Sequence, residues 1–592
     1  MSDQKNLFIA IAISLVVLLG FQYFYEMPRM ERQRAEQAAQ ALKDGAPKAG
    51  TATDAQTPQA PGSAAPAPAA AVPKTREEVL AGGERIKIST PKVRGSIALT
   101  GGRLDDLVLT EYRETVDPKS PEIVLLAPAG AEHAYYAEFG WTAAPSEQTK
   151  LPDGATVWQA DGTELTATKP IVLTWNNGDG LTFTRTVAID ANYMFTVTQK
   201  VENASGKKVT LFPYALVQRQ GTPKTEGLYI LHEGPLGVFR DKADSSGTLK
   251  EYSYKDVVSD KSIEFPSIGG WIGITDKYWL TALVPVDTAN VKARFSHVVR
   301  DGDRYQVDLL GAAVEVEQGQ SGENVQRLFA GAKVVNLIDA YADQYKIARF
   351  DRAIDWGWFY FLTRPVFFCI DFFFHVFGNF GLAILTLTII IKFLFLPLAY
   401  KSYVSMSQMK ELQPEMMKLR ERYGDDRQKL NEEMMALYRR SKVNPASGCL
   451  PIVLQIPVFF SLYKVIFTTI EMRHAPFYGW IHDLSAPDPT SWINLFGLLP
   501  FAVPHLGPLD IVNIGVWPLI MGVTMWAQMK LNPTPPDPVQ AKIFSFMPII
   551  FTFMLGKFAA GLVIYWSWNN TLSVAQQWFI MRRVAHRKKA AT

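Results

Sequence analysis

The sequence predicts a multidomain membrane protein in which an all-β sandwich domain outside the membrane is joined to an α-helical transmembrane bundle. Long runs rich in Phe, Leu, Ile, Met and Trp occupy the start of the 592-residue chain and the region after about residue 355. The region between them has the composition of a soluble protein, with the short alternating runs that are typical of strands. The near balance of 60 Lys and Arg against 57 Asp and Glu therefore averages two unlike regions.

The N-terminal segment is predicted to be an uncleaved signal anchor over residues 1–26, with its N-terminus in the cytoplasm. The apolar run from Leu7 to Tyr25 has nearly the roughly 20 residues that cross a bilayer, and Lys5 precedes it. A cleaved signal peptide is the alternative, but no small-x-small cleavage site follows closely. Residues 27–78 are rich in Ala, Pro, Gln, Gly and Thr, which predicts a disordered linker because few large apolar side chains are present to build a core.

Residues 79–350 are expected to form the β sandwich. Runs such as IVLTWNNGDGLTFTRTVAI alternate apolar and polar side chains and place Asn-Gly and Asp-Gly pairs at hairpin positions. His133, His232 and His297 are scattered singly, which favours structural histidines over metal ligands. We predict no metal site, no cofactor and no catalytic residue. The two cysteines of the chain lie in separate apolar segments, so a disulfide is not expected.

Residues 351–378 are predicted to form an amphipathic helix at the membrane interface. Arg364, Asp371 and His375 share one side of a helix at their spacing, and Pro365 suits a helix start. A narrow polar stripe on a Phe-rich helix favours an interfacial element over an ordinary core helix, which is the alternative.

The region 379–581 is predicted to be a five-helix core, which with the anchor makes six spans in total. The expected spans are about 379–399, 449–470, 512–530, 543–559 and 561–580, the last two forming a hairpin. Basic residues of short loops mark the cytoplasmic side. The segment 401–442 contains ten Lys and Arg and the basic tail 582–592 has five, whereas the loop 471–511 has only Arg473. Both termini are therefore expected in the cytoplasm, with the sandwich on the opposite side of the membrane, in the periplasm.

A cytoplasmic helical hairpin is expected over residues 401–445. Helical spacing of mixed charges predicts two antiparallel helices, roughly 402–422 and 425–441, with a break at Gly424 and Asp425. A solvated charged hairpin and a docking surface are both consistent with this pattern. The basic residues expected to contact cytoplasmic partners are Arg420, Arg422, Arg427, Arg439 and Arg440.

Lys392 lies in one of the most apolar stretches of the chain, with no acidic residue within ten positions on either side. A cation at the centre of a membrane helix costs about 2.5 to 3.5 kcal/mol and usually faces a bundle interior or a water-filled cavity. Thr388 lies one helical turn before it, and other spans contribute a polar face each, so a shared hydrophilic interior is expected. The alternatives are snorkelling of Lys392 and interhelical hydrogen bonds that only hold the bundle together. The other polar residues considered are Gln455, Thr552, Tyr565, Asn569, Ser573 and Gln576 or Gln577.

Three segments resemble a known family. They are VNPASGCLPIVLQIPVFFSLYKV from Val443, APFYGWIHDLSAPDP from Ala475 and KIFSFMPIIFTFMLGKFAAGLVIYW from Lys542. With the order of the parts, they resemble the YidC membrane protein insertase family in its Gram-negative form. The resemblance implies insertion of nascent proteins into the bacterial inner membrane and help in folding them, alone or with the Sec translocon.

The resemblance also implies a positively charged hydrophilic groove that receives the client chain. Lys392 stands where the family has an arginine, Thr388 and Gln455 match polar groove positions, and Trp566 matches an aromatic that contacts the substrate. Tyr565, Thr552 and Asn569 are expected beside them. The implied partners are nascent membrane proteins, the Sec translocon, the lipid bilayer, and ribosomes with their targeting factors, without recognition of a specific nucleic acid sequence. A small-anion transporter or channel that uses the same lysine is the alternative function.

Overall fold

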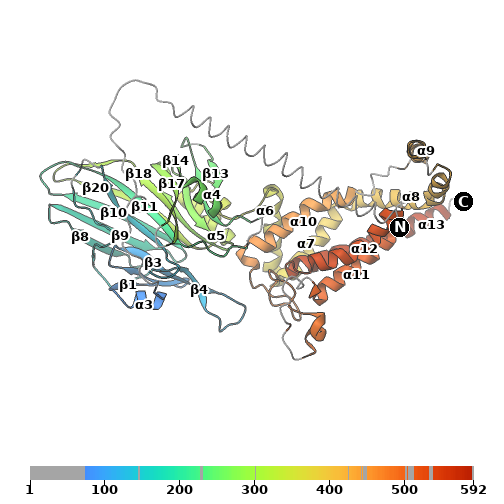
Figure 1. Ribbon diagram of the computed structural model, residues 1–592, viewed down its shortest axis with the longest axis horizontal. Helices are drawn as coiled ribbons and strands as arrows, with labels where there is room; N and C mark the ends of the chain where they lie inside the picture. Colours follow the sequence, from blue (N-terminus) through green and yellow to red (C-terminus); the bar gives the residue numbers. More distant parts are fainter. Residues whose placement is uncertain are drawn as a thin grey trace, which may run out of the picture. The chain divides into compact units, whose positions relative to one another are not determined.

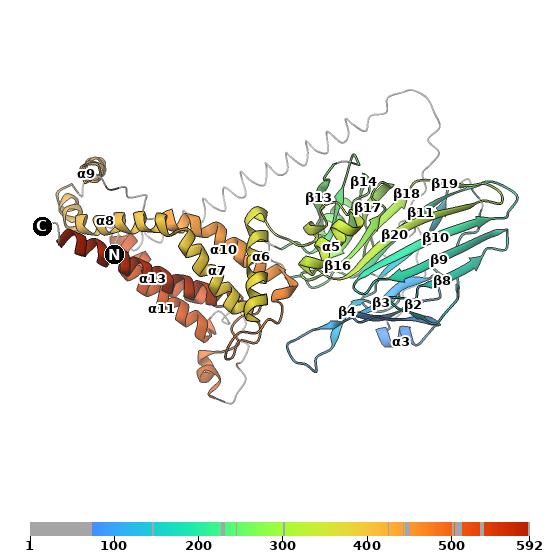
Figure 2. The same ribbon diagram turned by 180° about the vertical axis from the view of Figure 1, so that it is seen from behind.

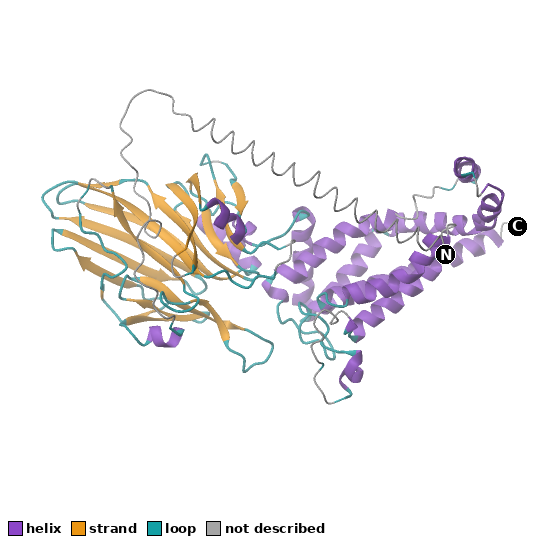
Figure 3. Cartoon of the chain, in the orientation of Figure 1, coloured by secondary structure: helices purple, strands orange, loops and turns teal. Residues whose placement is uncertain are grey.

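The computed structural model describes residues 74–589, apart from gaps at 145–146, 148, 227–230, 244, 300–301, 424–425, 442, 444–449, 500–502, 504–511 and 533–537. The predicted anchor, the linker up to residue 73, the helix break at Gly424 and Asp425, and Cys449 lie outside the described residues. The described chain has a strand-rich part and a helical part (Figure 3), and all the long helices, from α6 (Tyr360–Phe377) on, follow the strands in the sequence. The first helix, α3 (Arg76–Leu80), begins inside the segment that was predicted as linker, and a Thr75–Glu78 capping box defines its start.

The described strands form two large sheets, which confirms the predicted β sandwich (Figures 1 and 2). The first sheet has the order β14 (Ser262–Ile268), β17 (Asn290–Val299), β18 (Asp303–Gly311), β11 (Val209–Gln220), β5 (Tyr135–Ala143), β3 (Arg103–Arg113), β2 (Val93–Ala98), β1 (Arg85–Ser89) and β7 (Glu164–Leu165), with β19 (Val314–Val316) beside β11 and β4 (Glu122–Leu126) beside β3. The second has the order β13 (Thr248–Glu251), β12 (Gly234–Phe239), β15 (Trp271–Thr275), β16 (Trp279–Pro285), β20 (Ser321–Ala332), β10 (Met194–Asn203), β9 (Leu181–Ile189), β8 (Ile171–Asn176) and β6 (Gln159–Ala160).

The predicted Asn-Gly hairpin joins β8 to β9. The turn needs left-handed backbone at Gly178 and Gly180, where φ is 82° and 87°. The Asn177 side-chain oxygen accepts hydrogen bonds from the backbone N–H groups of Asp179 and Leu181 at 2.8 and 2.9 Å. Because this turn sets the register, alternate residues of β9 are buried along its whole length, as the sequence alternation predicted.

The core of the sandwich is built from apolar side chains that both sheets contribute to one cluster. Its aromatic members pack edge to face, as Tyr193 and Phe329 do with ring centroids 6.2 Å apart. Gly331 permits a close approach there, since a Cβ atom at this position would lie 2.2 Å from the Tyr193 ring. Two short helices, α4 (Tyr254–Asp260) and α5 (Val335–Tyr345), and the 3-10 helix η2 (Phe350–Ala353) complete this part of the chain.

The helical part follows the predicted order. Its described helices are α6 (Tyr360–Phe377), α7 (Phe380–Leu394), α8 (Leu396–Tyr423), α9 (Arg427–Arg440), α10 (Leu450–Thr468), α11 (Val516–Leu531), α12 (Pro538–Leu555) and α13 (Ala560–Lys589), with the 3-10 helices η4 (Ile470–Met472) and η5 (Trp492–Gly497) between α10 and α11. Pro365 does not start its helix as predicted. It is the sixth residue of α6, whose first turn begins at Tyr360.

The predicted span 379–399 is not one continuous helix. Helix α7 ends at Leu394, and α8 starts at Leu396 with a bend of 67° between them. Pro397 explains the break, because it has no N–H with which to continue the α7 hydrogen-bond ladder to Phe393. The first helix of the predicted hairpin therefore begins at Leu396, before residue 402, and Lys392 lies in the last turn of α7.

By length and composition, few of the described helices could each cross a membrane as a single continuous helix. Helix α6 passes this criterion, and α7 with α8 passes it as a bent pair. The apolar stretches Leu454–Thr468 and Val539–Leu555 are shorter. An interfacial position for α6 and the count of six spans stay predictions.

Polar contacts link the end of the sandwich to the helices that follow. The Lys464 ammonium on α10 pairs with Asp355 at 2.7 Å. Arg364 on α6 pairs with Asp339 of α5 at 2.5 Å, so it does not act with Asp371 and His375, which contact each other. Part of the predicted polar stripe of α6 thus serves to join α6 to α5.

Candidate functional site

Helix α13 carries a buried polar face that several other helices contact. Tyr565, Asn569, Ser573 and Gln577 follow one another at helical spacing, and all four side chains are buried. Gln576, the alternative to Gln577 in the predicted stripe, is only partly buried. The spacing alone placed these groups on one side of the helix, and the structure turns that side inward.

Lys392 lies against this face. Its Nζ atom donates a hydrogen bond of 2.6 Å to the Ser573 hydroxyl, which in turn donates to the Asn569 carbonyl oxygen at 2.8 Å. The Tyr403 side chain of α8 also hydrogen-bonds Ser573. Among the described residues, no carboxylate forms an ion pair with Lys392. An ammonium has more donors than this one bond uses, so Lys392 can still bind an acceptor.

Gln455 and Tyr565, two of the predicted groove residues, contact each other. The Gln455 side-chain amide of α10 donates to the Tyr565 hydroxyl of α13. Trp566, the next residue, packs against Phe459 of α10 and Phe551 of α12, with ring centroids 4.7 and 6.4 Å apart. These contacts place α10 beside α13 and leave Gln455 and Trp566 partly exposed.

Thr388 and Thr552, two of the predicted groove residues, both turn their hydroxyl groups to their own helices. Thr388 is buried one turn before Lys392 and donates to the Ile384 carbonyl oxygen at 2.7 Å. Thr552 donates to the Pro548 carbonyl oxygen at 2.7 Å. Each hydroxyl uses its only proton within its own helix, so it could contact a client only as a hydrogen-bond acceptor.

The predicted set of site residues omitted several polar contacts that hold α13 in place. Asn570 donates to the Thr524 hydroxyl of α11 at 3.4 Å, and Gln577 donates to the Asn532 side-chain oxygen at 3.2 Å. The Trp568 indole N–H donates to a carbonyl oxygen of α7 at 3.3 Å. The signal was present for Ser573 and Gln577, which follow Asn569 at four-residue intervals. Nothing in the sequence indicated which helix each one would meet.

The arginines predicted to contact cytoplasmic partners lie on α8 and α9. Arg422, Arg439 and Arg440 are exposed, whereas Arg420 is partly buried and already has a partner within the chain. The side chain of Arg427 lies outside the described residues. Three of the five predicted arginines therefore present a free surface.

The isolated histidines have structural roles where the structure describes their contacts. The His232 ring nitrogen bonds the Pro235 carbonyl oxygen at 3.2 Å, and burial lowers the pKa of this imidazole to about 4. His297 lies 2.9 Å from Asp303. No group of His, Cys, Asp and Glu suited to a metal ion occurs within the described chain.

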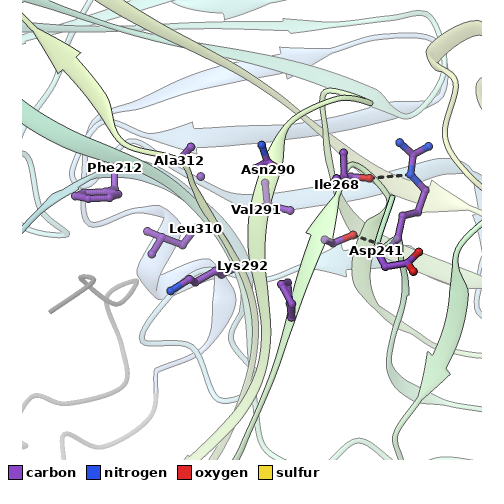
Figure 4. A pocket seen from close by; sticks show the side chains of 12 residues that line it. Phe212, Asp241, Ile268, Asn290, Val291, Lys292, Leu310 and Ala312 are labelled. Atoms are coloured by element: carbon purple, nitrogen blue, oxygen red, sulfur yellow. Dashed lines mark hydrogen bonds between the residues drawn. The ribbon is translucent and has the colours of Figure 1, made fainter. Parts of the chain in front are cut away.

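A hollow of about 510 Å³ lies on the β sandwich between β11, β14, β17 and β18 (Figure 4). Its walls are mostly apolar. The Arg240 guanidinium beside it is occupied by the Ile268 carbonyl oxygen and by Asp287, both within 2.8 Å. The Arg240 guanidinium is therefore already used within the fold, while Asp241 and Lys292 are the other charged residues that line the hollow.

Two family models match the chain. One is described as the YidC periplasmic domain and matches residues 85–369, and the other is described as 60Kd inner membrane protein and matches residues 372–588. Together they cover both the sandwich and the helices that contain Lys392.

Similar proteins match almost the full length of the chain. Proteins named membrane protein insertase YidC from Methylobacterium nodulans, Bradyrhizobium diazoefficiens and Brucella suis are 54%, 52% and 50% identical over 98% of this chain, which covers 95%, 97% and 96% of their lengths. A solved structure described as an active YidC insertase with the first transmembrane domain resolved is 18% identical with a TM-score of 0.35, covering 83% of this chain and 92% of that one. A galactose mutarotase-like protein from Lactobacillus casei is 11% identical with a TM-score of 0.29, covering 42% of this chain and 99% of that one.

Proposed function

The chain belongs to the YidC membrane protein insertase family. From this premise we propose that Lys392, which is held against the polar face of α13, receives the polar part of a client chain. Its function is that of a membrane protein insertase of the inner membrane, with a periplasmic β domain, and it is not an enzyme. The predicted groove residues and the path of the client belong to the proposal.

One observation carries the proposed client site, namely a lysine without a carboxylate partner among the described residues. Lys392 is only partly buried and is held by Ser573 at 2.6 Å. A neutral hydroxyl positions an ammonium without neutralising it, whereas a carboxylate would cancel the charge. The positive charge therefore remains available to an acidic or carbonyl group that enters from the membrane or from water.

The side chains around Lys392 offer a polar environment to one part of the client and an apolar environment to another. Lys392 and Gln455, which are only partly buried, offer hydrogen bonds to the hydrophilic part of a client, which reduces the cost of holding it at membrane depth. Exposed apolar side chains of α7, such as Ile390 and Phe393, offer a surface along which an apolar segment can pass into lipid. Burial of apolar area supplies about 25 cal/mol per Å². The membrane potential adds about 2.3 kcal/mol per charge per 100 mV for a translocated acidic group.

Charge distribution supports the proposed topology, with six spans and both termini in the cytoplasm. The hairpin over 401–445 and the tail after residue 581 are basic, while the loop 471–511 has a single basic residue. We place α6 at the membrane interface, because it has exposed aromatic side chains such as Phe361 and Phe372 on the same side as the ion pair of Arg364 with Asp339.

The proposed partners besides nascent membrane proteins are the Sec translocon and ribosomes with their targeting factors. Exposed arginines on α9, Arg439 and Arg440, support a contact with acidic protein surfaces or with RNA phosphates, without sequence recognition. No contact of these residues within the chain competes with such a partner among the contacts described.

Charge variants of Lys392 test the proposed function. We expect Lys392→Ala and Lys392→Glu to lower the insertion of a small client with an acidic tail into reconstituted vesicles, with the larger loss for the glutamate. Lys392→Arg should retain insertion, since it keeps the charge. The matched control is Lys530→Glu, which makes the same change at an exposed position at the end of α11. Unchanged insertion for the alanine and glutamate forms would remove Lys392 from the mechanism.

Photo-crosslinking distinguishes a client site from a solute site. A photoreactive residue at position 455, which is partly exposed beside Tyr565, should crosslink to a ribosome-bound client. The same residue at the exposed position Val523 of α11 serves as the control. Absence of crosslinks at 455, together with saturable anion flux through the vesicles, would instead support a small-anion transporter.

A further inference from the structure

The loop between α10 and α11 contains an exposed apolar segment, Ser491–Leu499, that the proposed client site does not use. Its exposed side chains are Trp492, Leu495, Phe496, Leu498 and Leu499. Leu498 is 82% exposed, one of the highest values for a large apolar side chain in the described chain. From Pro489 to Leu509 the sequence has no Asp, Glu, Lys or Arg, so the described segment Ser491–Leu499 is free of these charged residues.

The backbone of the segment turns the apolar side chains outward and its polar groups inward. Leu495 and Phe496 have left-handed backbone, with φ of 50° and 60°, a conformation that residues with a Cβ rarely adopt. The Phe496 N–H donates to the Ser491 carbonyl oxygen at 2.6 Å, and the Gly497 N–H donates to the Asn494 side-chain oxygen at 3.0 Å. These hydrogen bonds give two of the segment's backbone N–H groups a partner within the protein, as an apolar environment requires of a non-helical segment.

The segment is tied to the start of α11 by hydrogen bonds at both backbone and side chain. The Trp492 backbone N–H donates to the Ile514 carbonyl oxygen at 3.1 Å, and its indole N–H donates to the Val512 carbonyl oxygen at 2.6 Å. The Thr490 hydroxyl accepts from the Val516 N–H at 3.0 Å. These hydrogen bonds therefore hold the apolar side chains near the N-terminus of α11.

Asp488 marks the polar boundary of this arrangement. Its carboxylate accepts hydrogen bonds from the Trp517 N–H at 2.9 Å and from the Trp480 indole at 3.2 Å, and thereby caps the N-terminus of α11. Gly515 allows the carboxylate to approach, because a Cβ atom there would lie 2.5 Å from the Asp488 Cγ atom. Trp480 and Trp492, each with its N–H bonded and its ring partly exposed, are the type of residue found where a membrane meets water.

Helix α11, to whose start the segment is hydrogen-bonded, also has exposed apolar side chains. Leu519, Ile520 and Val523 of that helix are exposed, and an apolar helix of an inner-membrane protein contacts lipid along such a face. We propose that the segment Ser491–Leu499 inserts Leu495, Phe496 and Leu498 into the acyl region of the leaflet at the N-terminus of α11 and so fixes the depth of that helix. The occupant of the apolar surface is lipid, since the described segment Ser491–Leu499 has no charged side chain with which to select a protein partner and is hydrogen-bonded to the start of a helix with exposed apolar side chains.

A spin label at position 498 tests this inference. Leu498→Cys is made in the full chain with Cys369→Ser and Cys449→Ser, labelled with a nitroxide, and reconstituted in vesicles of phosphatidylethanolamine and phosphatidylglycerol. Collision of the label with oxygen, which concentrates in lipid, is compared by electron paramagnetic resonance with collision with a water-soluble nickel chelate. The matched control is a label at Val299, which is 74% exposed at the end of β17.

We expect the ratio of oxygen to nickel collisions to be severalfold higher at position 498 than at 299. A ratio equal to that at 299 would place the segment in water and overturn the inference. Low collision with both reagents would mean that protein covers the segment, either a second copy or another partner, and would also overturn it. A label at Leu495 supplies a second reading should Leu498→Cys fail to fold. The measurement uses no client, so it is independent of the role proposed for Lys392.

Discussion

Replacement of Glu471 with glutamine is expected to stabilise the protein at neutral pH and to remove part of its pH dependence. Glu471 lies in η4, directly after α10, and its Oε1 atom accepts a hydrogen bond of 2.8 Å from the N–H of Val335, the first residue of α5. Its Oε2 atom is buried and has no hydrogen-bond partner within the described chain. Burial outweighs the Val335 hydrogen bond and raises the pKa of the Glu471 carboxyl from 4.5 to about 7.

The size of the effect follows from this pKa difference. Below about pH 4.5 the Glu471 carboxyl is protonated in both the folded and the unfolded chain. As the pH rises from about 4.5 to about 7, the unfolded chain loses this proton first, so the free energy of unfolding falls. Above about pH 7 both forms are ionised and the folded chain carries the whole cost of a buried charge. A pKa difference of about 2.5 corresponds to about 3 kcal/mol.

Heat-induced unfolding in detergent micelles, followed by circular dichroism at several pH values, measures the prediction. Glutamine keeps an acceptor for the Val335 N–H but does not ionise, so Glu471→Gln should gain several degrees in Tm over the unmodified protein at about pH 8 and little at about pH 5. The control is Glu132→Gln at an exposed position on the sandwich, which should leave the pH dependence unchanged. Parallel pH profiles for Glu471→Gln and the unmodified protein would refute the reasoning.

Two further predictions concern contacts between elements. Gly522→Ala should lower the free energy of unfolding by about 1 to 3 kcal/mol, because the new Cβ atom would lie 2.2 Å from the Thr552 hydroxyl oxygen. Adding Thr552→Ala should restore most of the lost stability in the same thermal assay. Lys464→Met should lower the free energy of unfolding by about 3 kcal/mol, because it leaves the largely buried Asp355 carboxylate without its cation. The double variant with Asp355→Asn should recover much of this stability. A double variant as unstable as the single one would contradict this explanation.

The candidate site was predictable where it depends on periodicity. The polar stripe on α13 follows from four-residue spacing, and its burial follows from the cost of exposing polar groups to lipid. Thr388 shows the limit of this reasoning. The spacing placed it beside Lys392 correctly, but a threonine in a helix can bond its own backbone, and its hydroxyl donates to the Ile384 carbonyl oxygen. Periodicity indicates a face, whereas the partner of each polar group depends on which acceptor is nearest.

The bend between α7 and α8 was predictable in principle but was missed. Pro397 lies inside the apolar run and removes the N–H that would have continued the helix, so the chain turns by 67° after Lys392. A straight helix over 379–399 would have placed Lys392 in the middle of a span. The bend places it in the last turn of α7, where Ser573 can reach it.

The sequence by itself determined the division into a sandwich and a helical bundle, the hairpin between β8 and β9, and the polar side of α13. These features depend on alternation, turn chemistry and helical spacing, which are local properties of the chain. Only the tertiary structure decided that Ser573 binds Lys392 across 181 residues and that Glu471 caps α5 across 136. The physical reason is that a buried polar group must find a partner wherever packing brings one, and packing joins segments whose separation in the sequence leaves no local signal.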